Sequence, residues 1–278
     1  MKEQIKQLIG NLSDKMMARS LVREYCQTRI LQFLQERGVF RSWIFHGGTA
    51  LRLLYQLPRY SEDLDFALAA SNEALDFSDI TNHIRRAFEA EAYKVKTTIS
   101  GSRAVKSAFI SFPGIWHELG LSPHANETLA IKIEIDTRPP LGGNTETSLV
   151  RRFVLLNILH YDKASFLSGK LHAILARPYV KGRDLYDLLW YLSDRTWPEP
   201  NFEFLNNALK QTSWTGPEIA PANWADIIAK RISHIDWRKA NEDVRPFLEN
   251  PEEVKLLNKE NFLNLLKKRK GLEPSEKS

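Results

Sequence analysis

The sequence is poor in cysteine and has no long apolar run, and both absences limit the kind of protein it can be. Cys26 is the one cysteine among 278 residues, so the chain can form no internal disulfide bond, and nothing points to an oxidising compartment. The opening residues, MKEQIK, lack the apolar region of a secretory signal, and no apolar run has the length of a membrane-spanning helix. We therefore expect a soluble, cytoplasmic protein that does not contact a membrane.

Three common catalytic signatures are also missing. The cysteine and histidine residues do not have the spacing of a zinc site, and no order of Ser, His and Asp indicates a hydrolytic triad. The segment GGTALR (47–52) contains no Gly-Lys-Ser or Gly-Lys-Thr, so it is not a Walker phosphate-binding loop. His46, which precedes this segment, is more typical of a packed residue at a strand end than of a catalytic base.

The composition is that of a globular protein with a mild excess of positive charge. Hydrophobic residues make up 43% and charged residues 26%, which argues against wholesale disorder and allows a sizeable core. The formal net charge of +5 and the pI of about 9.2 favour a polyanionic partner. Spread over this length, the charge is a bias and does not define a nucleic-acid footprint.

Hydrophobic periodicity predicts an α/β half over residues 1–160 and a helical half over 161–278. In the first half, helices are expected at 2–36, 49–56 and 80–93, strands at 42–45, 63–68, 94–99, 104–112, 129–136 and 153–159, and a loop at 139–147. In the second half, helices are expected on either side of breaks at 197–200 and 215–217. Roughly the last ten residues are polar and are expected to be disordered.

The pair Asp63 and Asp65 is the first candidate for a functional site. On the strand predicted for this segment, residues two apart point to the same side, with about 7 Å between their Cα atoms. Two carboxylates at that separation can bind one divalent cation or two neighbouring cations, and Mg²⁺ prefers such oxygen ligands together with substrate phosphates. The alternative is a solvated strand face, which is the more common explanation for an isolated Asp-x-Asp.

Upstream of this pair, Gly47-Gly48-Thr49 stands between a predicted strand and a predicted helix. The positive end of a helix favours phosphate, glycines let the backbone approach a ligand closely, and Thr49 adds a hydroxyl. An ordinary glycine turn with Thr49 as the helix N-cap would explain the same residues. The order of strand, glycine turn, helix and acidic strand places an anion site beside a cation site, which favours binding of a nucleotide together with a metal ion.

The alternating segment KIEID (132–136) offers a third carboxylate. Glu134 and Asp136 share its polar side, and a two-metal site needs an acidic ligand beyond Asp63 and Asp65. A half-exposed strand with a charged outer side would show the same pattern. We choose Glu134 as the predicted ligand and keep Asp136 in reserve.

A fourth candidate lies in the helical half, in the segment GKLHAILARPYVKGRDLYDLLWYL (169–192). Lys170 lies on its first predicted helix, and the second helix carries Asp184 and Asp187 on one face, with Arg183 four residues before Asp187. These residues fit a surface ion-pair network. Taken alone they are more typical of such a network, but they also fit a triphosphate site in which Lys170 and Arg183 contact the phosphates and the aspartates orient them.

Taken together, these motifs resemble the AbiEii/AbiGii-type nucleotidyltransferase toxins, a branch of the DNA polymerase β-like nucleotidyltransferase superfamily. The resemblance covers residues 45–192, and the motifs stand in the order that the family shows: GGTAL (47–51), RYSEDLDF (59–66), IKIEID (131–136), then Lys170, Arg177 and GRDLYDLLWYL (182–192). It implies an α+β or α/β fold with a small mixed β-sheet flanked by helices. It also implies a helical C-terminal region that completes the nucleotide site.

The resemblance assigns roles to individual residues. Asp63, Asp65 and Glu134 would bind two Mg²⁺ ions, with Mn²⁺ as the alternative metal. Lys170 would join them as a catalytic residue. The nucleotide-binding residues implied by the motifs are Gly47, Gly48, Thr49, Ser61, Lys170, Arg183, Asp184 and Asp187.

From these roles we expect an enzyme that moves a nucleoside monophosphate from an NTP to an acceptor hydroxyl and releases pyrophosphate. The family resemblance implies the toxin of a bacterial toxin–antitoxin or phage-defence system, with a cognate antitoxin as partner. Because some members extend the 3′ end of tRNA, an RNA acceptor and above all a tRNA is implied. Two alternatives stay open: nucleotidylation of a protein or small-molecule hydroxyl, and a nucleotide- or RNA-binding module without catalysis.

Overall fold

Residues 2–69, 76–102 and 104–270 are described by the computed structural model, and the chain divides into two units. Unit 1 contains the chain up to residue 139 together with 145–160, and unit 2 contains residues 140–144 together with the chain from 161 onward. The predicted disorder of the C-terminal tail falls on residues 271–278, which lie outside the described residues.

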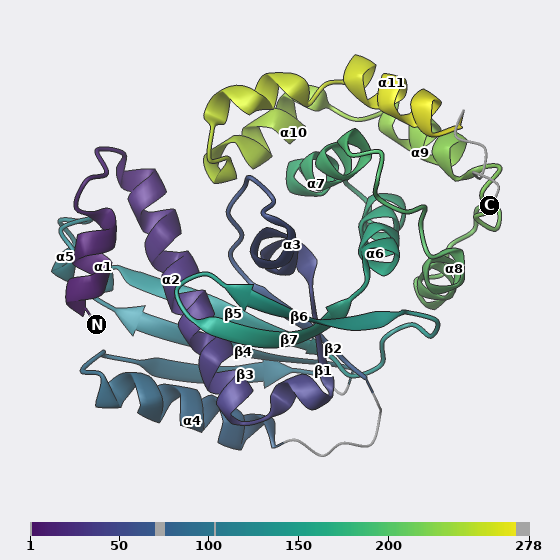
Figure 1. The fold of residues 1–278 in the computed structure, drawn as a ribbon. Helices are drawn as coiled ribbons and strands as arrows, with labels where there is room; N and C mark the ends of the chain where they lie inside the picture. The colour runs from purple at the N-terminus through teal and green to yellow at the C-terminus, as the bar shows by residue number, and fades with distance from the viewer. Residues whose placement is uncertain (1, 70–75, 103, 271–278) are drawn as a thin grey trace. The chain divides into compact units, whose positions relative to one another are not determined.

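Unit 1 is built on one sheet of seven strands in the order β3-β4-β5-β2-β1-β7-β6 (Figure 1). Strands β1 and β7 are parallel, as are β2 and β5, whereas β1–β2, β3–β4 and β4–β5 are antiparallel. The predicted mixed sheet flanked by helices is therefore confirmed. The strands are β1 (Trp43–His46), β2 (Leu64–Leu68), β3 (Lys96–Gly101), β4 (Val105–Pro113), β5 (Thr128–Asp136), β6 (Thr145–Arg151) and β7 (Leu155–Tyr161).

Helices of unit 1 bury an aromatic core against this sheet. Phe88 of one helix lies 4.9 Å from the ring of Phe112 on β4 and 5.0 Å from that of Phe33 on another helix. Phe45 on β1 and Phe66 on β2 pack 5.1 Å apart on the side of the sheet opposite to Asp65. The helices are α1 (Lys2–Ile9), α2 (Lys15–Glu36), α3 (Gly47–Tyr55), α4 (Phe77–Ala90) and α5 (Ile115–Glu118), and Figure 1 shows α4 along β3 and β4.

Two sequence-based expectations for unit 1 are wrong in detail. The single helix predicted over 2–36 is two helices, because Asp14 caps α2 by accepting hydrogen bonds from the amides of Met16 and Met17. Strand β6 begins at Thr145, inside the loop predicted over 139–147, and continues through residues for which no strand was predicted. This strand is at the edge of the sheet and most of its residues are exposed, so it carries no apolar alternation that could reveal it.

Unit 2 is helical, as predicted. Its helices are α6 (Lys163–Ala176), α7 (Gly182–Ser193), α8 (Phe202–Gln211), α9 (Trp224–Ile232), α10 (Trp237–Val244) and α11 (Lys259–Lys270). The buried Arg269 on α11 stabilises the segment that follows α7 by donating hydrogen bonds to the carbonyls of Asp194 (2.7 Å) and Trp197 (2.8 Å). The Trp197 ring in turn packs 4.3 Å from that of Tyr191. Across the described residues, no helix is both long enough and apolar enough to span a bilayer.

Candidate active site

Four polar side chains form a row across the middle of the sheet in unit 1. Asp65 on β2 is the register partner of Glu134 on the parallel strand β5 and of His46 on the antiparallel strand β1. Glu134 is also the register partner of Ser107 on β4, whose Oγ lies 3.4 Å from Glu134 Oε2. Register partners point to the same side of a sheet. The sheet therefore brings Asp65 and Glu134 together on one face.

The remaining two predicted acids lie outside this row, two residues along the chain from Asp65 and Glu134. Asp63 immediately precedes β2 and has the same parity as Asp65, so both belong to one side of the strand. Asp136 is level with Ala67, and its Oδ1 accepts a hydrogen bond from the amide of Arg138 (2.8 Å). Glu134 is thus the acid directly beside Asp65, whereas Asp136 caps the turn that follows β5.

A lysine that the sequence reasoning did not single out lies among these carboxylates. Lys132 is on the same side of β5 as Glu134, and its Nζ forms an ion pair with Glu134 Oε2. This hydrogen bond raises the pKa of Lys132 above its ordinary value, and the charges of Asp63 and Asp65 raise it further. The ammonium therefore neutralises part of the negative charge that the three acids place on one face of the sheet.

The residues fit the predicted metal in chemistry. Among the described residues, no group of three or more His, Cys, Asp and Glu side chains is arranged to hold a metal ion. Glu134 is engaged by Lys132 and by Ser107. Carboxylate oxygens on adjacent strands are nevertheless the donors that Mg²⁺ prefers, so Asp63, Asp65 and Glu134 suit it once Lys132 releases Glu134.

The glycine turn between β1 and α3 is shaped by the side chains around it. Gly47 has φ of +80°, and a Cβ at this position would collide with Oδ2 of Asp65. At Gly48 a Cβ would lie 2.6 Å from Nη2 of Arg59 and 2.8 Å from Oγ of Ser61. Glycine is required at Gly47, where φ is positive and the Asp65 carboxylate is close, whereas a Cβ at Gly48 would have to displace the ends of the Arg59 and Ser61 side chains. The turn, the predicted Ser61 and the acid Asp65 thus form one site at the start of α3.

The hydroxyl of Thr49 was expected to face a bound phosphate, and in the structure it has a partner within the protein. It is buried in the first turn of α3, and its hydroxyl donates a hydrogen bond to the backbone carbonyl of Asp63. The hydroxyl therefore positions the acidic strand. A second bond supports the same segment, since Gln27 on α2 donates from Nε2 to the carbonyl of Ser61 (3.1 Å).

The segment before the acids is also held by a buried ion pair. Glu24 on α2 pairs with Arg52 on α3, and its other oxygen accepts a hydrogen bond from Nε of Arg152 (2.7 Å). Arg52 donates to the carbonyl of Leu57 (3.2 Å), and its guanidinium carbon lies 4.0 Å from the ring centre of Tyr60. α2 and α3 together therefore order residues 57–63, which lead into β2.

In unit 2, most of the predicted late residues form one buried cluster. Lys170 on α6 places its Nζ 2.6 Å from Asp187 Oδ2 and 3.1 Å from Asp184 Oδ1, and both aspartates are buried. Arg177 pairs with the second oxygen of Asp184. The guanidinium of the predicted Arg183 lies over the ring of Phe247, 4.3 Å from the centroid. The structure thus brings Arg177, which belongs to the motif but was not assigned to the site, to Asp184.

One protein family matches most of the chain. The sequence model described as "Nucleotidyl transferase AbiEii toxin, Type IV TA system" aligns with residues 29–266. The chain belongs to this family. The resemblance inferred from the motifs is therefore confirmed, and with it the assignment as a nucleotidyltransferase of a toxin–antitoxin family. No curated protein sequence matches this AbiEii-family chain at a significant level.

Solved structures support the fold of the AbiEii-family chain. JHP933 from Helicobacter pylori aligns over 91% of this chain and 92% of its own, with 17% identity and a TM-score of 0.54. A proposed nucleotidyltransferase from H. pylori aligns over 92% of this chain and 98% of its own, with 19% identity and a TM-score of 0.50. At these identities the likeness concerns the fold, and it confirms the predicted nucleotidyltransferase architecture.

Three residues of the AbiEii-family site were missed by the sequence reasoning. Lys132 shares the polar side of KIEID with Glu134, so the alternation that revealed the acid also contained the lysine. Arg59 is part of the RYSEDLDF motif, but an arginine beside Pro58 looks like an ordinary loop residue until its burial is known. Ser107 had no local signal, because only the register of β4 with β5 places it beside Glu134.

Proposed function

We propose that this protein transfers a nucleoside monophosphate from an NTP to a hydroxyl group at the 3′ end of a tRNA. The acceptor oxygen forms a bond to the α-phosphorus while the bond from that phosphorus to the bridging oxygen breaks. Pyrophosphate leaves, and the proton of the hydroxyl passes to solvent. The reaction needs positioning and charge neutralisation and no covalent nucleophile, which agrees with a site made of carboxylates, a glycine turn and basic groups.

One observation carries the proposal: Asp65 touches both halves of the site in unit 1. It is the register partner of Glu134, and its carboxylate occupies the space that a side chain at Gly47 would need. The acids that suit a metal ion are therefore next to the first amides of α3, where a phosphate is favoured. Binding of a nucleotide phosphate together with a metal ion is the function that this arrangement supports best.

Enzymes of this class generally use divalent metal ions, and we propose Mg²⁺, or Mn²⁺, at Asp63, Asp65 and Glu134. When bound, the ions would polarise the α-phosphate and lower the pKa of the attacking hydroxyl. The pairing of β2 with β5 holds Asp65 beside Glu134, and the hydroxyl of Thr49 positions Asp63 through its backbone carbonyl. The absence of a side chain at Gly47 leaves room for the Asp65 carboxylate. Arg59, buried beside Gly48 and Ser61, adds a positive charge to the proposed phosphate site.

Lys170, in unit 2, is proposed as a further phosphate-binding residue. Its ammonium is fixed by two buried carboxylates, Asp184 and Asp187, so it would meet a phosphate as an oriented charge and not as a mobile surface lysine.

The toxin family implies a cognate antitoxin as a partner. The cytoplasm, where NTP and tRNA are present, is the proposed site of action.

The proposal is tested by incubating the protein with each α-labelled NTP in separate reactions that contain total tRNA, total protein or a pool of small-molecule hydroxyl compounds. We expect label on tRNA in the presence of Mg²⁺, and a decrease of at least about a hundredfold for Asp63→Ala. Asp79→Ala is the matched control, because Asp79 is exposed and pairs with Arg37 at the surface. Label on protein or on small molecules would contradict tRNA as the acceptor. Full activity of Asp63→Ala would contradict the assignment of the active site to this acid.

A further inference from the structure

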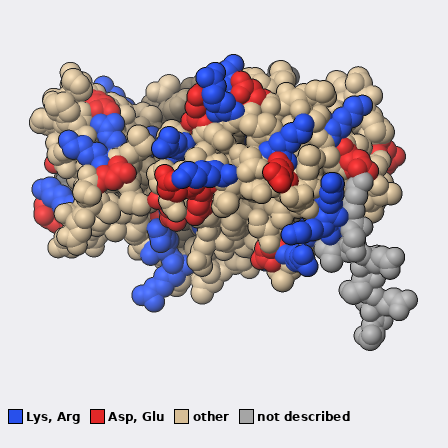
Figure 2. Space-filling model, turned by 90° about the horizontal axis from the view of Figure 1, so that it is seen from above, with Lys and Arg blue, Asp and Glu red and all other residues tan. Residues whose placement is uncertain are grey.

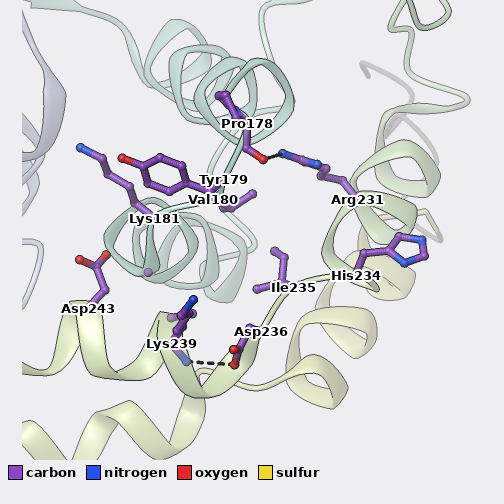
Figure 3. Close-up of a pocket in the computed structure, with 12 residues that line it drawn as sticks. Pro178, Tyr179, Val180, Lys181, Arg231, His234, Ile235, Asp236, Lys239 and Asp243 are labelled. Atoms are coloured by element: carbon purple, nitrogen blue, oxygen red, sulfur yellow. Dashed lines mark hydrogen bonds between the residues drawn. The ribbon is translucent and has the colours of Figure 1, made fainter.

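A cavity of about 560 Å³ lies within unit 2, and none of the residues that line it belongs to the Lys170 cluster. It is bounded by the connection between α6 and α7 and by the connection between α9 and α10, together with the first turns of α10. Figure 3 shows Tyr179 and Lys181 extending from the first connection, and Asp236 and Lys239 at the start of α10. None of these residues has a role in the site described above.

The connection that carries Tyr179 is held in a fixed conformation. Arg231 on α9 donates hydrogen bonds from Nη2 to the carbonyls of Arg177 (2.6 Å) and Pro178 (3.4 Å), and from Nε to the carbonyl of Ile174 (3.1 Å). The Tyr179 side chain that follows is 70% exposed. An aromatic ring that is exposed on a fixed backbone is available for stacking, and it loses little conformational freedom when a ligand binds.

The charges that line the cavity leave two ammonium groups available. Asp236 accepts hydrogen bonds from the amides of Arg238 and Lys239 (both 3.1 Å), and Asp243 accepts one from the amide of Arg183 (3.4 Å). The two acids therefore face helix N-termini, whose partial positive charge offsets part of their own. No described residue pairs with the ammonium of Lys181 or of Lys239.

The lysines and the tyrosine of this cavity matter for binding a polyanion because the face drawn in Figure 2 has no broad basic surface. There, Lys and Arg side chains stand among Asp and Glu side chains and do not merge into one patch. On this face a polyanion would therefore be held at particular places where free cations and an aromatic ring occur together. The cavity in unit 2 combines both.

We propose that this cavity binds a single-stranded segment of RNA, with one base stacked on Tyr179 and backbone phosphates contacting Lys181 and Lys239. This inference rests on the proposed function, because it names the surface that holds the RNA acceptor. An exposed ring with two separate lysines suits a strand that continues past the cavity, since stacking and point charges follow a backbone without reading its sequence. A free nucleotide would be better served by a closed pocket with a bidentate arginine, whereas Arg231 is committed to backbone carbonyls.

The test measures binding of a fluorescein-labelled single-stranded RNA, and of total tRNA, to the full chain carrying Asp63→Ala, so that no transfer occurs during titration. We expect Tyr179→Ala to weaken binding by about tenfold and Tyr179→Phe to retain it, because stacking needs the ring and not the hydroxyl. The double variant Lys181→Ala/Lys239→Ala should lower the slope of log Kd against log salt by ~1.4, which corresponds to two lost phosphate contacts to a single strand.

The matched control is Lys210→Ala/Lys267→Ala, which removes the same charge from exposed positions of α8 and α11 outside the cavity. It should leave the salt slope near that of the parent. Unchanged RNA affinity and salt slope in the Tyr179 and Lys181/Lys239 variants, with tRNA labelling by the wild type intact, would overturn the cavity proposal alone. A loss of ATP affinity in place of RNA affinity would also overturn it. If the wild type labels another acceptor and does not bind RNA, the proposed function fails as well.

Discussion

Asp65 and Glu134 are neighbours across the parallel strands β2 and β5, on the same face of the sheet, although a long stretch of chain separates them. Lys132, which shares that face, forms an ion pair with Glu134. The site in unit 1 therefore consists of acids whose mutual repulsion is reduced by a lysine when no other cation is present.

Glu134 and Asp136 provide a matched pair of acids on one strand. We expect Glu134→Gln to reduce nucleotidyl transfer by about a hundredfold, because it removes the charge beside Asp65. Asp136→Asn should change the rate by less than about threefold, since Asp136 accepts a hydrogen bond from the Arg138 amide and an amide oxygen can replace it. Initial rates with labelled NTP measure both variants. The reverse order of effects would make Asp136 the third acid.

Lys132 should control how strongly the protein responds to Mg²⁺. In Lys132→Met the three acids lose their neutralising ammonium, so we expect a lower Tm than that of the wild type in metal-free buffer and a larger increase in Tm when Mg²⁺ is added. Differential scanning fluorimetry with EDTA and then with MgCl₂ measures both effects. Lys96→Met, at an exposed position of the edge strand β3, is the control. Equal Mg²⁺ responses in all three proteins would show that Lys132 and a cation do not compete for these acids.

The glycine turn should tolerate no side chain at its first position. Gly47→Ala would put a Cβ against the Asp65 carboxylate in a left-handed backbone conformation, and we expect transfer to fall by at least about tenfold with a loss of about 1–3 kcal/mol in stability. Gly169→Ala is the matched control, because nothing lies near its Cβ position and the residue is inside α6. It should stabilise the helix by about 0.5–1 kcal/mol. Urea unfolding and initial rates separate the two effects, and wild-type activity of Gly47→Ala would contradict the close approach.

The buried pair of Glu24 and Arg52 should be essential to stability. Glu24→Ala removes the buried carboxylate that pairs with Arg52 and Arg152, and breaking a buried ion pair costs about 3–5 kcal/mol in the free energy of unfolding. Glu36→Ala, at the exposed end of α2, removes the same group and should change that free energy by less than about 0.5 kcal/mol. Urea denaturation followed by circular dichroism gives both values. Similar small changes in the two variants would show that the pair contributes no more than a surface contact.

The single cysteine is a natural probe of unfolding. Burial raises the pKa of the Cys26 thiol to about 12, so at pH 8 the native protein should react with a thiol reagent only through opening of the fold. An unfolded thiol ionises near pH 8.5, as an ordinary cysteine does; the stabilising contribution of the buried neutral thiol is therefore complete below about pH 8.5 and decreases as the pH rises toward 12. Labelling with Ellman's reagent in buffer and in urea measures the difference. Fast labelling of the native protein would contradict the burial of Cys26.

Several elements of the site could be read from local pattern. The alternation in EDLDFAL and in LAIKIEID predicted strands with acids on one side, and β2 and β5 have those sides. The two glycines predicted a close approach at the start of a helix, and α3 begins at Gly47. These properties depend on neighbouring residues, for which the period of a strand or the freedom of a glycine is decisive.

Other elements depended on contacts that no local pattern contains. Thr49 looked like a phosphate ligand, but its hydroxyl is used by the Asp63 carbonyl. Arg183 precedes Asp187 by one helical turn, and its guanidinium lies over the ring of Phe247, while Arg177 from the end of the preceding helix pairs with Asp184. A long side chain can turn toward either of two neighbours, and the packing around it selects one.

The amino-acid sequence alone predicts the family, an α/β half followed by a helical half, and the acids that share one side of each strand. Which acids become neighbours is settled by how β2 and β5 pair. A shift of that pairing by one residue would place Glu134 opposite Leu64 or Phe66 and turn its carboxylate away from Asp65. The register is selected by burial of Phe66, Ile133 and Ile135 on the other face, a property of the whole folded unit.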